Sequence, residues 1–350
     1  MPLGGVFVID VLGIPAESKV VQKWTLENLA TSTEIQYLGY PIPAVGQTAP
    51  SAQQLLNLLP FEIDIILPSF IIHWNPNPEI GWWDTITETW QTEGVSDIAY
   101  NHETFKVLFQ TTKAKPHAVI QSRVREYPYK SWNCRPTSEN TALFTLKTVM
   151  SEVVFKVGDG WCQLVQPSFP VVADLLTQQF PPKVLLQQLS RRGLQIMPED
   201  DDAQYCGVKV KNAELEIKAC RDAALAIPAF TLASNPLNKT KDANHILVRI
   251  QEIPEFLYPP TLEKSKLVKT VNYLHKGCVL IDHSDKLPDY KEKVDAVLAD
   301  KYATYNAAML VALRGNCLGT SQAKMENGNV AFTNSVNALM YALRLFSFGP

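Results

Sequence analysis

The chain has 350 residues, of which 46% are hydrophobic and 19% are charged, and its formal net charge is −3. This length can bury a sizeable core and suffices for two domains of ordinary size, so extensive disorder is not expected. The slightly acidic balance gives no general attraction for a polyanion, which argues against nucleic-acid binding through phosphate neutralisation.

The amino terminus and the cysteines indicate the cellular compartment. The opening residues, MPLGGVFVIDVLG, lack the basic region of a signal peptide, and no apolar run reaches the length of about 18 residues that could span a bilayer. The six cysteines stand singly and never as C-x-x-C. We therefore expect an intracellular protein with no membrane contact, reduced thiols and no structural zinc.

Strand patterns dominate the first 165 residues. Apolar alternation over residues 4–12 predicts a strand that stops at Gly13, and residues 51–60 predict a short helix with Ser51 and Gln54 as a capping box. Alternation resumes from residue 61, and Gly158 to Gly160 supply the turn of a predicted hairpin. Further strand-like segments are ETFKVLFQTT, HAVIQSRV and TALFTLKTV.

Beyond Pro167 the apolar period changes to that of helices. PPKVLLQQLSRRG predicts a helix whose buried face holds Val184, Leu185 and Leu189, and NAELEIKACRDAALAIP predicts a second helix capped by Asn212. Strand character returns at HILVRIQEI and GCVLIDHSD. Helical spacing then follows over residues 289–315 and again over about 334–348.

Together these patterns predict an α+β, β-rich fold. We expect an antiparallel β-sandwich-like domain over residues 1–165, followed by a mixed α+β domain over residues 166–350 that ends in a helix. The boundary is placed where the apolar period changes, because no flexible linker separates the two halves.

Established catalytic motifs are absent from the sequence. It contains no Walker A loop, G-x-G-x-x-G, H-E-x-x-H, G-x-S-x-G or EF-hand pattern, so we expect no enzyme activity, cofactor or metal. The acidic run PEDDD, whose carboxylates are at residues 199–202, could offer oxygen ligands to a cation. Because it lacks the spacing of a calcium loop, it is interpreted as a solvated loop. The IDHSD segment at 281–285 is likewise interpreted as a polar turn after a strand.

Three of the seven tryptophans, Trp82, Trp83 and Trp90, lie within the segment GWWDTITETW. One interpretation is an aromatic platform, as on a sugar-binding sandwich. The other, which we favour, is that the three rings are largely buried and pack the sandwich or its junction with the next segment.

Two further sets of residues are candidates for protein contact. Lysines that could meet an acidic protein surface, or could simply form a solvated face, are Lys239, Lys241, Lys264, Lys266 and Lys269. The terminal helix presents an apolar stripe of Val336, Leu339, Met340, Leu343 and Phe346, which must be covered by the second domain or by a partner. Arg344 is expected on another face, so Arg344→Ala should be tolerated far better than Leu343→Asp.

Several segments in order resemble the axonemal dynein accessory intermediate-chain family, also called the cancer susceptibility candidate family. They include LGGVFVIDVLGIPAESKVVQKWTL, GWWDTITETWQTEGVSDIAYNHETFKVLFQTT, KPHAVIQSRVREYPYKSWNCRP, VLLQQLSRRGLQIMPEDDDAQYCGVKV, NAELEIKACRDAALAIPAF and VNALMYALRLFSFGP. The resemblance covers most of the chain and carries no catalytic residue.

The resemblance implies a non-catalytic structural protein of the ciliary or flagellar axoneme. Its expected partners are axonemal dynein subunits, tubulin or doublet-microtubule proteins, and its expected location is the cytoskeleton of the cilium, reached from the cytoplasm. The resemblance implies a charged helical extension before the folded region, whereas this sequence reaches GGVFVID after three residues. The expectation of partners held by that extension therefore does not carry over, and a related axonemal site on the doublet or a spoke is the alternative. The alternatives are a cytoplasmic dynein-arm assembly factor and, from another class, a β-sandwich that binds a small ligand or sugar.

Overall fold

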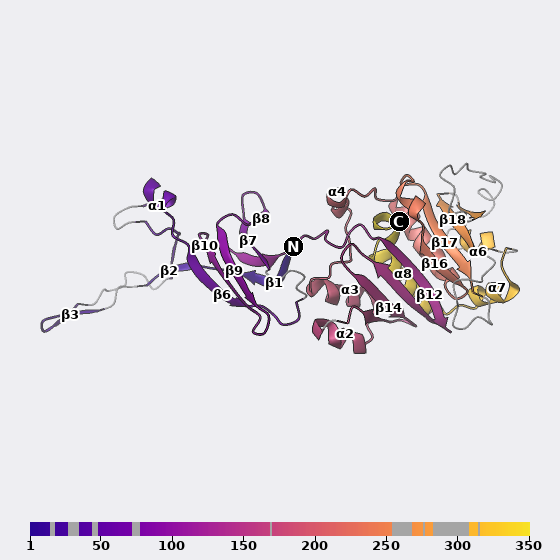
Figure 1. Ribbon diagram of the computed structural model, residues 1–350, viewed down its shortest axis with the longest axis horizontal. Helices are drawn as coiled ribbons and strands as arrows, with labels where there is room; N and C mark the ends of the chain where they lie inside the picture. The colour runs from indigo at the N-terminus through magenta and orange to yellow at the C-terminus, as the bar shows by residue number, and fades with distance from the viewer. Residues whose placement is uncertain are drawn as a thin grey trace. The chain divides into compact units, whose positions relative to one another are not determined.

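The computed structural model divides the chain into two compact units, Met1–Ser122 (unit 1) and Arg123–Pro350 (unit 2). Each unit is described by itself (Figure 1). The structure describes residues 1–14, 18–26, 35–43, 48–71, 78–168, 170–253, 268–275, 277–282, 308–313 and 316–350.

Unit 1 is built from antiparallel strands. A four-stranded sheet has the order β1-β11-β7-β8, a three-stranded sheet has the order β6-β10-β9, and β2–β5 and β3–β4 form two-stranded ribbons. The elements are β1 (Pro2–Phe7), β2 (Val11–Gly13), β3 (Lys19–Val21), β4 (Trp24–Leu26), β5 (Gln36–Leu38), α1 (Ala52–Leu56), β6 (Phe61–Ile66), β7 (Glu79–Asp84), β8 (Thr89–Gln91), β9 (Val95–Asn101), β10 (Lys106–Thr111) and β11 (His117–Ile120).

The core of unit 1 draws on both of its larger sheets. Ile80 and Val119 come from the four-stranded sheet, and Val107 and Phe109 come from the three-stranded sheet. All four are at most 1% exposed and belong to one cluster with Leu3, Leu67 and Ile71. Two sheets that share one core form a sandwich, as the strand alternation predicts.

Unit 2 is organised around one antiparallel sheet of eight strands, in the order β15-β14-β13-β12-β16-β17-β18-β19. Side chains alternate between buried and accessible along its first strands: Trp132, Cys134, Phe144 and Phe155 are at most 1% exposed. The strands are β12 (Ser131–Ser138), β13 (Thr141–Lys147), β14 (Glu152–Val157), β15 (Cys162–Gln166), β16 (Phe230–Ser234), β17 (Ile246–Glu252), β18 (Val268–Leu274) and β19 (Gly277–Asp282).

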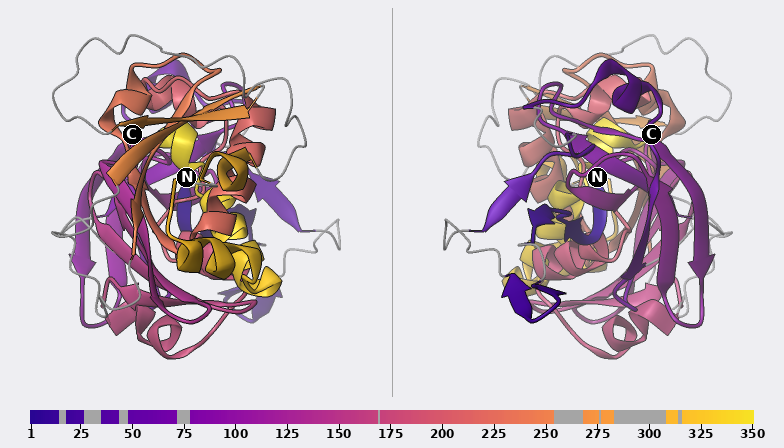
Figure 2. Two further views of the ribbon diagram at one scale, coloured as in Figure 1. Left: turned by 90° about the vertical axis from the view of Figure 1, so that its right-hand side faces the viewer. Right: turned by 90° about the vertical axis from the view of Figure 1, so that its left-hand side faces the viewer.

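Helices cover the buried face of this sheet. The two longest, α5 and α8, contact each other, and each contacts strands of the sheet (Figure 2). The helices are η1 (Pro170–Val172), α2 (Ala173–Thr177), α3 (Pro182–Arg191), α4 (Asp202–Cys206), α5 (Ala213–Ala226), η2 (Pro236–Lys239), α6 (Ala308–Leu313), α7 (Gly319–Glu326), α8 (Val330–Ala342) and α9 (Leu345–Phe348).

Local signals in the sequence predicted these elements well. The Ser51–Gln54 capping box forms at α1, and the Asn212 side chain accepts a hydrogen bond from the Leu215 amide at α5. The predicted hairpin is β14–β15, with Gly160 at φ +81. The predicted β-rich α+β class is therefore confirmed. In α3, however, the buried positions are Pro182, Leu185, Leu186 and Leu189, while Val184 is exposed.

The boundary predicted at residue 166 needs correction. Strands β12 to β15, which precede it, belong to the same sheet as β16 to β19, and the compact units divide between Ser122 and Arg123. The pairing that joins the two halves is β12 with β16, through Asn133 opposite Ala233. A change of apolar period marks a change of element type, and here both element types build one layered unit.

Candidate functional site

The predicted tryptophan cluster forms the hairpin β7–β8 of unit 1. Trp83 lies directly opposite Trp90, and their rings meet edge to face at 5.3 Å between centroids. The Trp82 indole donates a hydrogen bond to the Glu93 carbonyl at 2.8 Å, and the Lys113 ammonium lies 5.2 Å from its ring centroid.

These three tryptophans are of intermediate burial, neither fully buried nor exposed, so the expectation that they are largely buried stays a prediction. Alternation along β7 places Trp82 on the same face as the core residue Ile80 and places Trp83 on the opposite face. Strand β8 is an edge strand of this sheet, and its Trp90 shares the face of Trp83.

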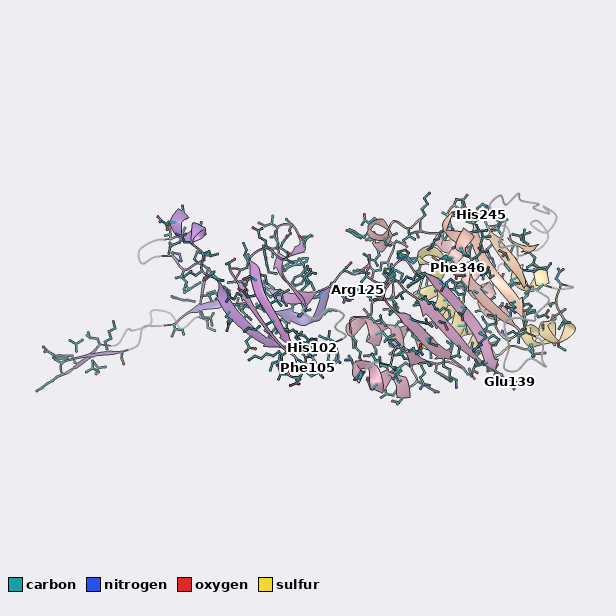
Figure 3. All side chains as sticks on the ribbon, viewed as in Figure 1. His102, Phe105, Arg125, Glu139, His245 and Phe346 are labelled. Atoms are coloured by element: carbon teal, nitrogen blue, oxygen red, sulfur yellow. The ribbon has the colours of Figure 1, made fainter. Side chains whose placement is uncertain are left out.

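The apolar stripe at the carboxyl end lies entirely inside unit 2. Leu339, Leu343 and Phe346 are 0% exposed, as are Val336 and Met340. The Phe346 ring meets Trp132 of β12 edge to face at 5.8 Å, which places it over the sheet (Figure 3). The Phe348 carbonyl accepts a hydrogen bond from the Tyr129 amide at 2.8 Å, so the last residues are held directly against the sheet.

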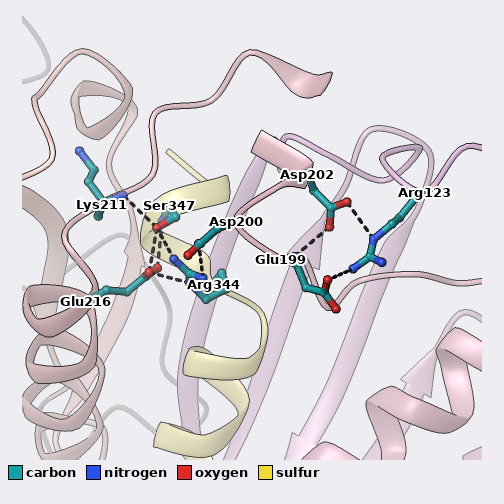
Figure 4. Close-up of polar contacts among 8 residues, drawn as sticks. All are labelled: Arg123, Glu199, Asp200, Asp202, Lys211, Glu216, Arg344 and Ser347. Atoms are coloured by element: carbon teal, nitrogen blue, oxygen red, sulfur yellow. Dashed lines mark hydrogen bonds and ion pairs between the residues drawn. The ribbon is translucent and has the colours of Figure 1, made fainter. Parts of the chain in front are cut away.

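The terminal helix is not continuous. It breaks into α8 and α9 at Arg344, whose φ of +47 lies in the left-handed region. The Arg344 guanidinium is paired with two carboxylates, through Nε to Glu216 Oε2 and through Nη1 to Asp200 Oδ1, both at 2.7 Å (Figure 4). Arg344 thus has two carboxylate partners on its own face, while its expected tolerance to alanine relative to Leu343→Asp stays a prediction.

Glu216 is the centre of this cluster and is 0% exposed. Besides Arg344, its carboxylate accepts hydrogen bonds from the Ser347 amide at 3.0 Å and the Ser347 hydroxyl at 2.8 Å. The Lys211 amide donates to the same hydroxyl at 3.1 Å. We call Lys211, Glu216, Arg344 and Ser347 the C-terminal clamp, since they fasten α9 to α5 by charge-assisted bonds in a buried setting.

Lys211 fixes a loop beside the clamp. Its ammonium donates to three backbone carbonyls, those of Asn238, Lys241 and Asp242, at 2.9 to 3.2 Å. Burial lowers the pKa of Lys211 to about 8. Its contacts to fixed carbonyls explain how the charged form is tolerated there.

Asp222 is a second buried acid on α5, outside the clamp. Its Oδ2 accepts a hydrogen bond from the Met309 amide of α6 at 2.6 Å, and burial raises its pKa to about 7. The Tyr273 hydroxyl lies against the Met309 sulfur, at 3.2 Å. Asp222 thus fixes α6 and carries a proton at a pH where an ordinary aspartate does not.

In the acidic run, Glu199, Asp200 and Asp201 are exposed, as expected for a solvated loop, whereas Asp202 is 3% exposed. The run also pairs with arginines of unit 2: Arg123 contacts Asp202 at 2.8 Å and Glu199 at 2.9 Å. Asp200 belongs to the Arg344 pairing. No group of metal ligands was found among the residues that the structure describes.

The predicted lysines do not form one described cluster. Lys239 is exposed at the end of η2, while Lys241 and Lys269 are half-buried. Lys269 lies on β18, opposite Ile250 of β17. Lys264 and Lys266 lie outside the described residues, as do 283–285 of the IDHSD segment and most of the helix expected over 289–315.

Unit 1 exposes a second apolar region that sequence analysis did not single out. It comprises the described residues 8–14, 18–26 and 35–42, including both two-stranded ribbons, and we call it the apolar arm. Trp24 is 76% exposed and Val20 is 72% exposed, although both belong to strands. Other exposed members are Val8, Leu12, Ile14, Val21, Leu26, Ile35, Tyr37 and Ile42.

The sequence did contain a signal for the two buried acids. Glu216 has helical spacing to the buried Ala219, Cys220 and Ala223, and Asp222 has it to Ala219 and Ala226. A carboxylate inside an apolar stripe is rare unless it is paired. That signal indicates that each carboxylate needs a partner. It does not identify the partner, because Arg344 lies 128 residues from Glu216 in the sequence.

Comparison with known proteins shows relatives of one kind. The chain is 23% identical to Dynein axonemal intermediate chain 7 of Danio rerio over 99% of this chain and 47% of that protein. It is 26% identical to the Mus musculus protein of that name, over 99% of this chain and 46% of the relative. The Bos taurus protein is 25% identical over 71% of this chain and 34% of its own length.

The chain therefore spans about half the length of the curated relatives it matches in zebrafish and mouse. No family model matches it. The matches support the axonemal dynein intermediate-chain family that the sequence segments resemble. Among the described helices, none is long and apolar enough to cross a membrane.

Proposed function

We propose that this chain, a relative of the axonemal dynein intermediate chains, is a non-catalytic accessory protein of the ciliary or flagellar axoneme. In this proposal it acts by holding partners together, and those partners are dynein subunits, tubulin or neighbouring doublet proteins. The support is the relationship to proteins named Dynein axonemal intermediate chain 7 along nearly the whole chain.

The observation that carries a binding role is the apolar arm. The arm exposes ten large apolar side chains within a short stretch of sequence, and exposed apolar surface that is more than scattered single residues marks protein contact sites. An isolated two-stranded hairpin such as β3–β4 is marginally stable in water, so burial against a partner would stabilise it. Burying one side chain of the size of Val20 or Leu26 contributes about 1.5 to 3 kcal/mol.

Fractionation of cilia tests the proposal. An epitope-tagged chain should remain in the axoneme after detergent and salt extraction. The double variant Val20→Ser, Trp24→Ser should shift to the soluble fraction, because it removes two of the most exposed side chains of the arm. Its matched control is Ile86→Ser, which alters a side chain that is 91% exposed in the β7–β8 turn, outside the arm.

The fractionation has two outcomes that oppose the proposal. If the wild-type chain is found only in the cell body, the alternative of a cytoplasmic dynein-arm assembly factor replaces it. If wild type and the double variant remain in the axoneme equally, the arm is not the contact surface, and the C-terminal half of unit 2 becomes the next region to vary.

A second candidate, binding of a small ligand or sugar, draws on the half-exposed tryptophan hairpin. The rings of Trp83 and Trp90 are inclined by 62°, so they do not form the flat surface on which a sugar ring stacks. Titration with a glycan panel, followed by tryptophan fluorescence, tests this candidate. A saturable shift that Trp83→Phe abolishes would support it, whereas a flat response would remove it.

A further inference from the structure

The accessible face of the eight-stranded sheet is hollowed. A depression of about 510 Å³ crosses five neighbouring strands, β14, β13, β12, β16 and β17. Its floor is formed by residues opposite the buried face: Asn133 and Arg135 alternate with the buried Trp132 and Cys134 on β12. The helices α5 and α8 contact strands of the sheet, whose buried residues lie on the face opposite this hollow.

The charge of this hollow is opposite to that of the chain. Arg135, Lys147 and Arg249 line it with one carboxylate, Glu152, whereas the whole chain has a net charge of −3. Lys147 pairs with Glu152 at 3.3 Å, and both side chains are about half exposed. For Arg135, the described part of the chain shows no carboxylate within ion-pair distance.

The remaining lining suits a peptide. Asn133, Thr145 and Gln251 offer amide and hydroxyl groups that can bond to peptide backbone, and Leu143 and Ala233 provide a shallow apolar floor. Among the described lining residues none is aromatic, although base stacking on aromatic rings is the usual support for single-stranded nucleic acid. The lining therefore favours an acidic polypeptide over a nucleic acid.

We propose that this face of the sheet binds an extended acidic segment of a partner protein, with Arg135 meeting its carboxylates. Four inter-strand spacings of about 4.8 Å give a length of roughly 19 Å, which about six extended residues span. This surface lies in unit 2, apart from the apolar arm, and it can bind such a segment whether or not the partner is a dynein subunit.

The experiment is a binding titration with the full chain. The probe is a short, fluorescein-labelled peptide of alternating Glu and Thr residues, and fluorescence anisotropy is recorded at low and at physiological salt. A Gln–Thr peptide of the same length and a labelled oligothymidylate are the comparison ligands. Thermal melts of every variant establish that unit 2 remains folded.

Three variants define the expected result. Arg135→Glu should weaken peptide binding roughly tenfold, since it replaces an attractive charge with a repulsive one at a partly exposed site. Glu152→Gln should strengthen binding, because it removes the only lining carboxylate named above, and a merely structural role would not produce that gain. Lys183→Glu, on the exposed face of α3, should leave the affinity unchanged.

Several results would overturn the proposal. One is the absence of saturable binding of the Glu–Thr peptide at low salt. Another is an equal loss of affinity in Lys183→Glu and Arg135→Glu, which would indicate non-specific attraction. Tighter binding of the oligothymidylate than of the peptide would assign the face to nucleic acid instead. None of these results bears on axonemal fractionation, so this inference and the proposed function can fail separately.

Discussion

Units 1 and 2 differ in how completely they cover their apolar side chains. Of the 24 large apolar side chains that are exposed among the described residues, 16 lie in unit 1, the shorter unit. Unit 2 instead buries its stripe at α8 and α9 fully and fastens it with the C-terminal clamp. The contrast indicates that unit 2 is stabilised mainly by its own contacts, whereas the described residues of unit 1 leave more apolar surface uncovered.

The largest loss of stability is expected when Glu216, the centre of the C-terminal clamp, is replaced. Glu216→Ala leaves the half-buried Arg344 without its fully buried carboxylate partner. Removing one member of a buried ion pair costs about 3 to 5 kcal/mol. We expect the unfolding of unit 2 to shift to lower denaturant while unit 1 is unchanged, measured by guanidinium titration. Glu214→Ala, at an exposed position in the same helical turn, is the matched control and should cost far less. Equal losses in the two variants would show that the clamp does not stabilise unit 2.

A pH titration tests whether burial in unit 2 is as complete as the structure indicates. Burial raises the pKa of Asp222 from 3.8 to about 7, so the folded state retains a proton that the unfolded state has released between those values. The stabilising contribution of that proton is complete below about pH 4 and is lost as the pH rises through about 7. Asp222→Asn keeps an acceptor for the Met309 amide and carries no charge.

We therefore expect Asp222→Asn to match wild type near pH 4 and to be more stable by roughly 2 to 4 kcal/mol near pH 8, from about 1.4 kcal/mol per pKa unit. The measurement is the denaturant midpoint at both pH values. A difference that does not change with pH would mean that Asp222 is ionised in the folded protein.

Replacing one tryptophan in each unit compares the two cores, and the expected losses of stability are intermediate in size. Trp132 of unit 2 is 1% exposed, and its replacement by alanine should cost about 3 to 5 kcal/mol. Trp83 of unit 1 is half-buried on an outer face, so Trp83→Ala should cost about 1 to 2 kcal/mol. Chemical denaturation of the two variants measures both losses of unfolding free energy. Similar losses would indicate that Trp83 packs as a core residue.

The smallest expected effect is in the apolar arm. Trp24→Ser should change the free energy of unfolding by no more than about 0.5 kcal/mol, because the side chain is 76% exposed and contributes little to the folded chain itself. The same variant should reduce the binding of a fluorescent apolar dye. A large loss of stability would show that the arm packs within unit 1.

Much of the local structure could be predicted from the sequence. The Ser51–Gln54 capping box, the Asn212 cap and the turn at Gly160 depend on residues within a few positions of one another. The alternation over Phe61 to Ile66 likewise predicted which face of β6 is less exposed. These features were predictable because backbone geometry and capping bonds act over short sequence distances.

The candidate sites were predicted less well, since they depend on contacts between distant segments. Clustering of Trp82, Trp83 and Trp90 could not reveal that Trp83 pairs with Trp90 on one face of the hairpin β7–β8 while Trp82 lies on the other. Helical spacing predicted a continuous helix through Arg344, whereas the buried Glu216 holds that residue at a break. The lysine set was chosen by proximity in sequence, and its described members do not gather in one cluster.

Sequence patterns alone were sufficient to predict the type of many described elements and the β-rich class. They also predicted that the apolar stripe from Val336 to Phe346 must be covered. Only the tertiary structure decided which sheet each strand joins, where the units divide and which carboxylates are paired. The physical reason is that hydrogen bonds in turns, caps and single helices form between neighbours in the chain. Sheet order and buried ion pairs join residues such as Asn133 and Ala233, or Glu216 and Arg344, which only the folded chain brings together.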